Sequence, residues 1–76
     1  MVTAYVMVKA STGDVDRLKS EIAAVDGGVE STSVVAGDID YIVKVRVDSP
    51  GDVKDIATAI HEIAGIEDTQ TYIAMD

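Results

Sequence analysis

The feature that most constrains the fold is the spacing of hydrophobic residues along the chain of 76 residues. Segments with apolar residues at every second position, typical of strands, alternate with segments in which they recur every three or four positions, typical of helices. This strand–helix–strand pattern occurs twice. The first segment alternates with a period of two, which predicts a strand. One face of this segment carries Val2, Ala4, Val6 and Val8. The other face is also apolar, at Tyr5 and Met7. We therefore expect a strand that is central in its sheet or covered on both sides.

Two amphipathic helices are predicted. The first follows the turn and capping residues Ser11–Asp14 and ends at Asp26–Gly28. Its apolar positions are Val15, Leu18, Ile22 and Val25. The second begins at Ser49 and Pro50, a capping hydroxyl followed by a proline at the first helical position, and ends at Gly65. Its apolar stripe is Val53, Ile56, Ala57, Ile60, Ile63 and Ala64.

Further strands are predicted over residues 29–36, 41–47 and 66–75, with a turn at Gly37–Asp40. The order β-α-β-β-α-β favours an α+β, ferredoxin-like fold, in which a four-stranded antiparallel sheet has both helices on one face. The other face then lacks a cover, and we expect two such sheets to pack face to face in a dimer. The residues expected on that face are Tyr5, Met7, Ile42, Lys44 and Arg46.

The length predicts a single small domain that spans residues 1–76, and the composition indicates that this domain associates with other subunits. A chain of this length buries a modest core, and it has no cysteine for disulfides or structural zinc. Its hydrophobic content is 47% and its mean hydropathy is +0.21. Such apolar content in so small a chain indicates surface that another subunit covers.

The charge balance excludes several partners. Fourteen acidic residues against six basic ones give a net charge of −8, so we expect no direct binding of nucleic acid and no binding to anionic membranes. The same pattern is typical of proteins from salt-loving microbes, although an ordinary acidic protein has it too. Neither an export signal nor a membrane-spanning apolar run is visible, which favours a cytoplasmic location.

Known chemistries of this fold lack their residues here. There is no thiol pair for a metal chaperone, no asparagine for an acyl-phosphate hydrolase and no glycine-rich phosphate loop after the first strand. The single histidine, His61, has no nearby nucleophile to activate. We therefore expect no enzyme, no catalytic residue, no metal and no cofactor.

Two polar features remain. One is the turn Gly37-Asp38-Ile39-Asp40, and the other is Thr69-Gln70-Thr71 in the last strand, whose two threonines lie on one face. Ordinary turn and strand preferences explain both equally well. The residues alone leave a ligand site and a purely structural role open.

With these features, nearly the whole chain resembles the effector-binding C-terminal domain of the Lrp/AsnC regulators of amino-acid metabolism. Three segments carry the resemblance, namely "AYVMVKAS" (4–11), "VVAGDIDYIVKVRV" (34–47) and "IHEIAGIEDTQTYIAM" (60–75). It implies a dimer formed through the sheets, octamers or decamers of such chains, and a small amino acid bound where dimers meet. The family's usual N-terminal DNA-binding helix-turn-helix has no counterpart here, so we expect a stand-alone effector domain or one excised from a longer regulator.

The resemblance also implies the ligand site. The family's motif falls on Gly37, Asp38, Asp40 and Tyr41, and its strand threonines fall on Thr69 and Thr71. Carboxylates can accept charge-assisted hydrogen bonds from an ammonium group, and backbone N–H groups near a glycine can bind a carboxylate. For Asp40 a structural role is the alternative, in which it stabilises the turn through hydrogen bonds to the turn's backbone. Ile39 stands where the family usually has an aromatic residue, which affects the identity and strength of any ligand.

Three functions are weighed. The leading hypothesis is an amino-acid-sensing and oligomerisation module that acts on transcription through partners, including full-length Lrp/AsnC regulators. The alternative is a structural assembly domain with a degenerate ligand site, which Ile39 supports. An enzyme of the ferredoxin-like dimer type, such as an open-face monooxygenase or isomerase, needs a histidine or polar cluster between sheet and helices, and none is evident.

Overall fold

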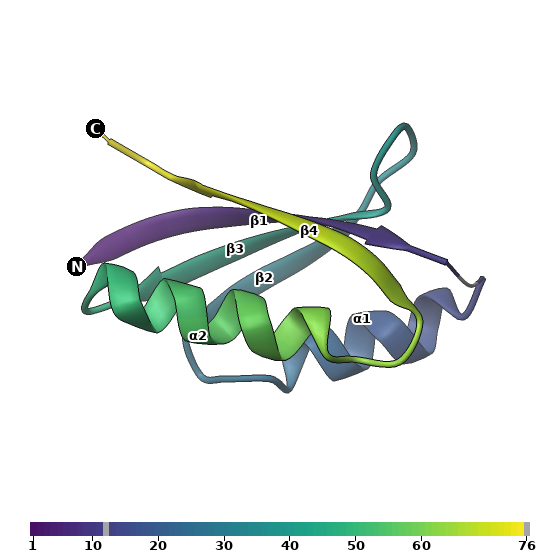
Figure 1. Cartoon of the computed structure of the whole chain (residues 1–76), viewed down its shortest axis with the longest axis horizontal. Helices are drawn as coiled ribbons and strands as arrows, with labels where there is room; N and C mark the ends of the chain where they lie inside the picture. Colours follow the sequence, from purple (N-terminus) through teal and green to yellow (C-terminus); the bar gives the residue numbers. More distant parts are fainter. Residues whose placement is uncertain (12, 76) are drawn as a thin grey trace.

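The computed structural model describes residues 1–11 and 13–75. Its elements are β1 (Val2–Ala10), α1 (Val15–Ala23), β2 (Val29–Val34), β3 (Tyr41–Val47), α2 (Pro50–His61) and β4 (Ile66–Ile73). The four strands form one antiparallel sheet in the order β2-β3-β1-β4. Both helices lie on the same side of this sheet (Figure 1). The predicted α+β, ferredoxin-like fold is confirmed.

The core lies between the sheet and the two helices. In the middle of the central strands β1 and β3, every second residue is buried, as the period of two predicts. The buried set is Ala4, Val6, Val8, Tyr41, Val43 and Val45 from the sheet, with Leu18, Ile22, Val53, Ile56 and Ile60 from the helices. Eleven buried hydrophobic residues among those described make a small core, in which burying one leucine, isoleucine or valine side chain contributes about 1.5–3 kcal/mol.

Helix α2 begins as predicted. Ser49 is its N-cap, the backbone N–H of Asp52 donates to the Ser49 hydroxyl at 3.4 Å, and Pro50 occupies the first turn. The helix ends at His61, earlier than the apolar stripe indicates. Ile63 lies beyond the helix, in the turn to β4, and still packs on the core. Its apolar character therefore reflects burial without helical backbone.

Helix α1 differs from the prediction at both ends. Asp14 is at the N-cap, but its side chain makes no capping hydrogen bond. Thr12, which belongs to the predicted turn and capping segment Ser11–Asp14, lies outside the described residues. At the other end the helix stops at Ala23, and Val25 follows as a half-buried residue of the connection to β2.

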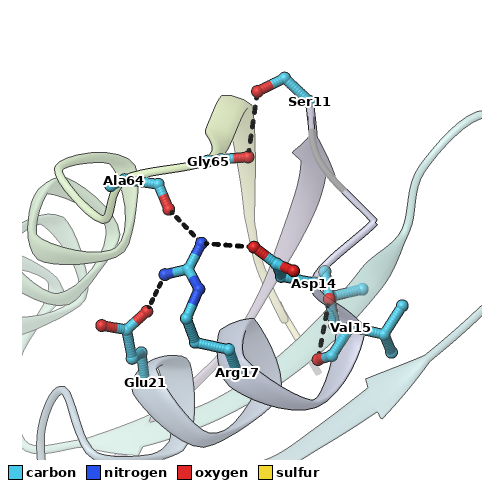
Figure 2. A network of polar contacts seen from close by, with 8 residues as sticks. Ser11, Asp14, Val15, Arg17, Glu21, Ala64 and Gly65 are labelled. Carbon is cyan, nitrogen blue, oxygen red and sulfur yellow. Dashed lines mark hydrogen bonds and ion pairs between the residues drawn. The ribbon is translucent and has the colours of Figure 1, made fainter.

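An arginine on α1 fastens this helix to the turn before β4. The Arg17 guanidinium donates to the carbonyl of Ala64 at 3.1 Å and also pairs with Asp14 and Glu21 (Figure 2). Beside it, the backbone N–H of Ser11 donates to the carbonyl of Gly65 at 2.8 Å. These contacts join the end of β1, the start of α1 and the α2–β4 turn at one end of the molecule.

Strands β2 and β4 are two residues shorter than expected. Residues 35 and 36 belong to the loop before β3, where the N–H of Val35 donates to the carbonyl of Asp40 at 2.9 Å. Strand β4 ends at Ile73. Neither helix in the described part of the chain is long and apolar enough to cross a membrane.

Candidate functional site

The loop between β2 and β3 carries the predicted Gly-Asp-Ile-Asp motif. It stands above the sheet on the side opposite the helices (Figure 1). Gly37 has φ +140°, a backbone conformation that other residues rarely adopt, so the glycine is required for the bend. The N–H of Asp40 donates to the carbonyl of Val8 at 2.9 Å, which ties the base of the loop to β1.

The two aspartates of the loop have different surroundings. Asp38 is exposed near the tip. Asp40 is half-buried, and its Oδ2 atom accepts a hydrogen bond from the backbone N–H of Ala10 at 2.8 Å. The β1–β4 register shifts between Lys9 and Ala10, so this carboxylate satisfies a backbone donor where the pairing of the two strands is irregular. Asp40 thus holds β1 and the loop together, the structural alternative considered above, although the bond reaches another strand.

Tyr41 lies in the core beneath α1. Its side chain is 1% exposed, and its hydroxyl donates to the carbonyl of Val15 at 3.1 Å. Burial raises the pKa of Tyr41 above 10.0, and the neighbouring Asp40 carboxylate raises it further, while Arg17 acts in the opposite direction. The side chain of Tyr41 therefore serves packing and is not at the surface.

Thr69 and Thr71 lie on the helix side of the sheet. Thr71 is opposite Val6 and Thr69 is opposite Val8 in the β1–β4 register, and directly opposed residues point to the same face. Val6 and Val8 are fully buried, whereas Thr69 is half-buried and Thr71 exposed. The helices therefore cover the central strands and leave the inner face of the edge strand β4 accessible.

A groove runs between α2 and β4 over these threonines. Its volume is about 370 Å³, within the range of about 300–1,000 Å³ that is typical of small-molecule pockets. The lining residues are Pro50, Val53, Lys54, Ala57, Thr58 and His61 from α2, with Thr69, Thr71 and Ile73 from β4. The α2 residues fall on one helical face at spacings of three and four. None of them was predicted as a site residue, because their role depends on α2 lying beside β4.

The loop does not line the groove within one chain, although Thr69 borders both the groove and a small hollow next to the loop. None of residues 37–40 lines the α2–β4 groove. Instead Ile39 lies beside Met7 and Lys9 in a hollow of about 60 Å³ that Asp68, Thr69 and Gln70 complete. The predicted site residues therefore form two separate groups, with Asp38 on the loop and both threonine hydroxyls on the helix side.

The open face of the sheet carries the residues predicted there. Tyr5 pairs with Lys44, Met7 with Ile42 and Thr3 with Arg46. These residues alternate with the buried ones along β1 and β3, so their side chains point to the opposite face of the sheet. Tyr5, Met7, Ile42 and Lys44 are half-buried and Arg46 is exposed. That a second copy covers this face remains a prediction.

Two further residues belong to the open face and were missed. Tyr72 pairs with Tyr5 and is 54% exposed, and its place follows from the alternation once Thr71 faces the helices. Glu30 lies 3.9 Å from both the Lys44 amine and the Arg46 guanidinium, measured from its carboxylate oxygens. The β2–β3 register shifts between Val29 and Ser31, so a strict alternation along β2 does not predict on which face Glu30 lies.

A larger groove of about 500 Å³ lies at the far end of β3, where Val47 and Gly28 meet α2. Its rim holds Asp26, Asp48, Asp52 and Asp55 beside Arg46. No group of three or more histidine, cysteine or acidic residues in the described chain is arranged to hold a metal ion.

The structure is thus an α+β, ferredoxin-like domain with a carboxylate loop bent at a glycine and a separate groove lined by hydroxyls. The family model described as the Lrp/AsnC ligand-binding domain matches residues 3–76. The chain therefore belongs to the Lrp/AsnC ligand-binding domain family, as the resemblance indicated. A comparison with curated proteins found no match.

Several solved structures have a fold similar to that of this chain. A protein from Thermus thermophilus is 28% identical with a TM-score of 0.91, over 100% of this chain and 95% of that one. A hypothetical protein from Pyrococcus horikoshii is 32% identical with a TM-score of 0.86, over 99% and 90%. A feast or famine regulatory protein from Mycobacterium tuberculosis, solved with L-methionine, is 25% identical with a TM-score of 0.81. All of this chain matches 51% of that regulator.

Proposed function

We propose that this chain binds a small amino acid between subunits and couples the binding to its own assembly, which acts on transcription through partner regulators. One observation carries the proposal: the exposed carboxylate of Asp38 and the hydroxyls of Thr69 and Thr71 are accessible but belong to separate surfaces of one chain. A zwitterion offers an ammonium and a carboxylate close together. Two subunits that present one surface each can bind both ends of such a ligand.

The first level of assembly is a dimer through the open sheet face. This face is partly apolar, at Tyr5, Met7 and Tyr72, and it also carries Glu30 beside Lys44. A two-fold axis places the same patch on both sides, so a patch that holds both charge signs can complement itself. A second copy of this chain is therefore the proposed occupant.

The second level brings dimers together at the groove. In the proposed arrangement, the Gly37–Asp40 loop of one dimer reaches the α2–β4 groove of a neighbouring dimer. Asp38 accepts the ammonium group, and Asp40 keeps the loop in place through Ala10. Because the ligand binds only where two dimers meet, it stabilises the larger assembly, which we expect to be an octamer or decamer.

The family and its relatives support the regulatory part of the proposal. The Mycobacterium tuberculosis relative is named as a regulatory protein and was solved with L-methionine. For this chain, we propose that co-assembly with full-length Lrp/AsnC regulators transmits the signal. The net charge of −8 disfavours direct contact with DNA, and neither an enzymatic activity nor a cofactor is part of the proposal.

A structural assembly domain with a degenerate site is the second candidate. Ile39 favours it, because an aliphatic residue replaces the aromatic that the family resemblance implies at this place in the loop. Ile39 also lines the same small hollow as Met7 and Lys9. In this candidate the chain assembles in the same way but is indifferent to amino acids.

Thermal unfolding with each of the twenty amino acids separates the two candidates. A ligand present at 100 times its Kd stabilises the native state by about 2.7 kcal/mol, which shifts the Tm of so small a domain by roughly 10 °C or more. We expect one amino acid or a small group to do this, and Asp38→Asn to abolish the shift. Asp48→Asn, the same change at the opposite end of the sheet, serves as the matched control. Indifference to all twenty would favour the structural candidate.

A further inference from the structure

We propose that two surfaces of the site bind different parts of the ligand. The α2–β4 groove binds the carboxylate and an aliphatic side chain, and Asp38 of another subunit binds the ammonium group. This inference rests on the proposed function. Its consequence is that the chain distinguishes an amino acid from the corresponding 2-oxo acid by assembly and not by occupancy of the groove.

The charge of the groove is opposite to that of the chain. The protein has 14 acidic and 6 basic residues, yet among the residues that the structure describes no aspartate or glutamate lines the α2–β4 groove. Lys54 is its one lysine or arginine. In a chain that otherwise repels anions, this groove offers a carboxylate a cationic partner without a competing carboxylate beside it.

The neighbours of Lys54 favour an anion at the same end. Lys54 lies one turn from Pro50, at the N-terminal end of α2, where the helix dipole is positive. Thr58 follows one turn later on the same face, and Thr71 lies across the groove on β4. An ammonium and two hydroxyls can together donate hydrogen bonds to both oxygens of one carboxylate.

The remaining wall selects the side chain of the ligand. Val53, Ala57 and Ile73 supply aliphatic surface, and Ile73 is 41% exposed although it faces the helix layer. Among the described lining residues no carboxylate can pair with a basic side chain, and no phenylalanine, tyrosine or tryptophan offers a large ring for stacking. The groove therefore fits a short aliphatic or thioether side chain better than a charged or aromatic one.

The groove has no anion to accept an ammonium group. Its described polar side chains, apart from Lys54, are the hydroxyls of Thr58, Thr69 and Thr71 and the His61 ring. An ammonium obtains an ionised acceptor only from a loop such as that of Asp38, which belongs to another subunit in the proposed assembly. A 2-oxo acid keeps the carboxylate and the side chain but replaces the ammonium by a carbonyl, so it fills the groove without recruiting that loop.

The test uses two matched pairs of probes: L-leucine with 4-methyl-2-oxopentanoate, and L-methionine with 4-methylsulfanyl-2-oxobutanoate. Calorimetry measures binding to the purified chain, and sedimentation velocity measures assembly in the same buffer. We expect both members of at least one pair to bind competitively, and only the amino acid to increase the sedimentation coefficient. A 2-oxo acid that drives assembly as its amino acid does, or that fails to bind while its amino acid binds, would overturn the inference alone. Binding of neither member of either pair would overturn the inference, and with it the proposed function for these ligands.

Two variants separate the roles of the surfaces. Lys54→Met is expected to weaken the affinity for the 2-oxo acid about tenfold or more, because it removes the cationic partner. Asp38→Asn is expected to leave that affinity unchanged and to abolish assembly driven by the amino acid. Lys19→Met, at an exposed position of α1, is the matched control for lost charge. An unchanged 2-oxo acid affinity in folded Lys54→Met protein would contradict the assignment of the carboxylate to Lys54.

Discussion

The carboxylate of Asp40 accepts a hydrogen bond from the backbone N–H of Ala10 at 2.8 Å, across 30 residues of sequence. The bond gives the Ala10 N–H an acceptor at the end of β1, where its pairing with β4 is irregular. It also fixes the base of the loop that carries Asp38. The two aspartates of one motif thus differ, since Asp40 positions the loop through Ala10 and Asp38 is exposed, as its proposed role in ligand binding requires.

Replacing Asp40 by alanine tests its task. The change leaves the half-buried N–H of Ala10 without its charged acceptor, so we expect a loss of about 1–3 kcal/mol in the free energy of unfolding. Asp38→Ala, an exposed change two residues earlier, should lie within about 0.5 kcal/mol of the parent. Urea unfolding measures both, and equal effects of the two changes would contradict the division of tasks.

Tyr41→Phe removes the hydrogen bond to Val15 and the titration of a buried phenol. We expect a loss of about 1 kcal/mol at neutral pH. Because burial raises the pKa of Tyr41 above 10.0 in the folded state, the parent keeps this contribution below pH 10.0 and loses it as the pH rises through the folded-state value. Unfolding measured from pH 7 to 11 should therefore show the two proteins converging in alkali, and a constant difference would argue against it.

Thr32→Val is expected to stabilise the protein. The hydroxyl of Thr32 is buried on the helix side of β2, opposite Val43, and has no hydrogen-bond partner among the described residues. Valine has the same shape and no polar atom to leave unsatisfied, so we expect a gain of about 1 kcal/mol. Thr32→Ser keeps the hydroxyl and removes the methyl group, and should give no gain. A less stable valine variant would show that the hydroxyl has a role.

Arg17 tests the fastening of α1 to the α2–β4 turn. Its guanidinium contacts Asp14, Glu21 and the carbonyl of Ala64 simultaneously (Figure 2). Because these contacts are exposed, we expect Arg17→Met to cost only about 0.5–1 kcal/mol. Arg17→Lys should recover little of the loss, since an ammonium lacks the planar fork that reaches several acceptors at once. Thermal unfolding in low and high salt measures the ionic share, and full rescue by lysine would contradict the geometry.

Most of the fold was predictable because it depends on local patterns. The alternation of β1 placed Val6 and Val8 inside and Tyr5 and Met7 on the open face, and the structure has that register. Ser49 and Pro50 marked the start of α2 correctly. The same alternation read along β3 places Tyr41 with the buried Val43, but its position in the family motif suggested a ligand residue.

The candidate site was only partly predictable because it depends on tertiary neighbours. Nothing local indicates that the Asp40 carboxylate reaches Ala10, since the bond exists only once β1 pairs with both β3 and β4. The separation of Asp38 from Thr71 has the same origin, because β1 lies between their strands. Lys54 joins the threonines only through the packing of α2 beside β4.

Native mass spectrometry of the purified chain, with and without each of the twenty amino acids, tests the central claim most directly. The account predicts an octamer or decamer that forms or gains mass with one amino acid or a small group of them, and an Asp38→Asn variant that remains dimeric. A dimer indifferent to all twenty would contradict ligand-coupled assembly and leave a structural assembly domain as the better description.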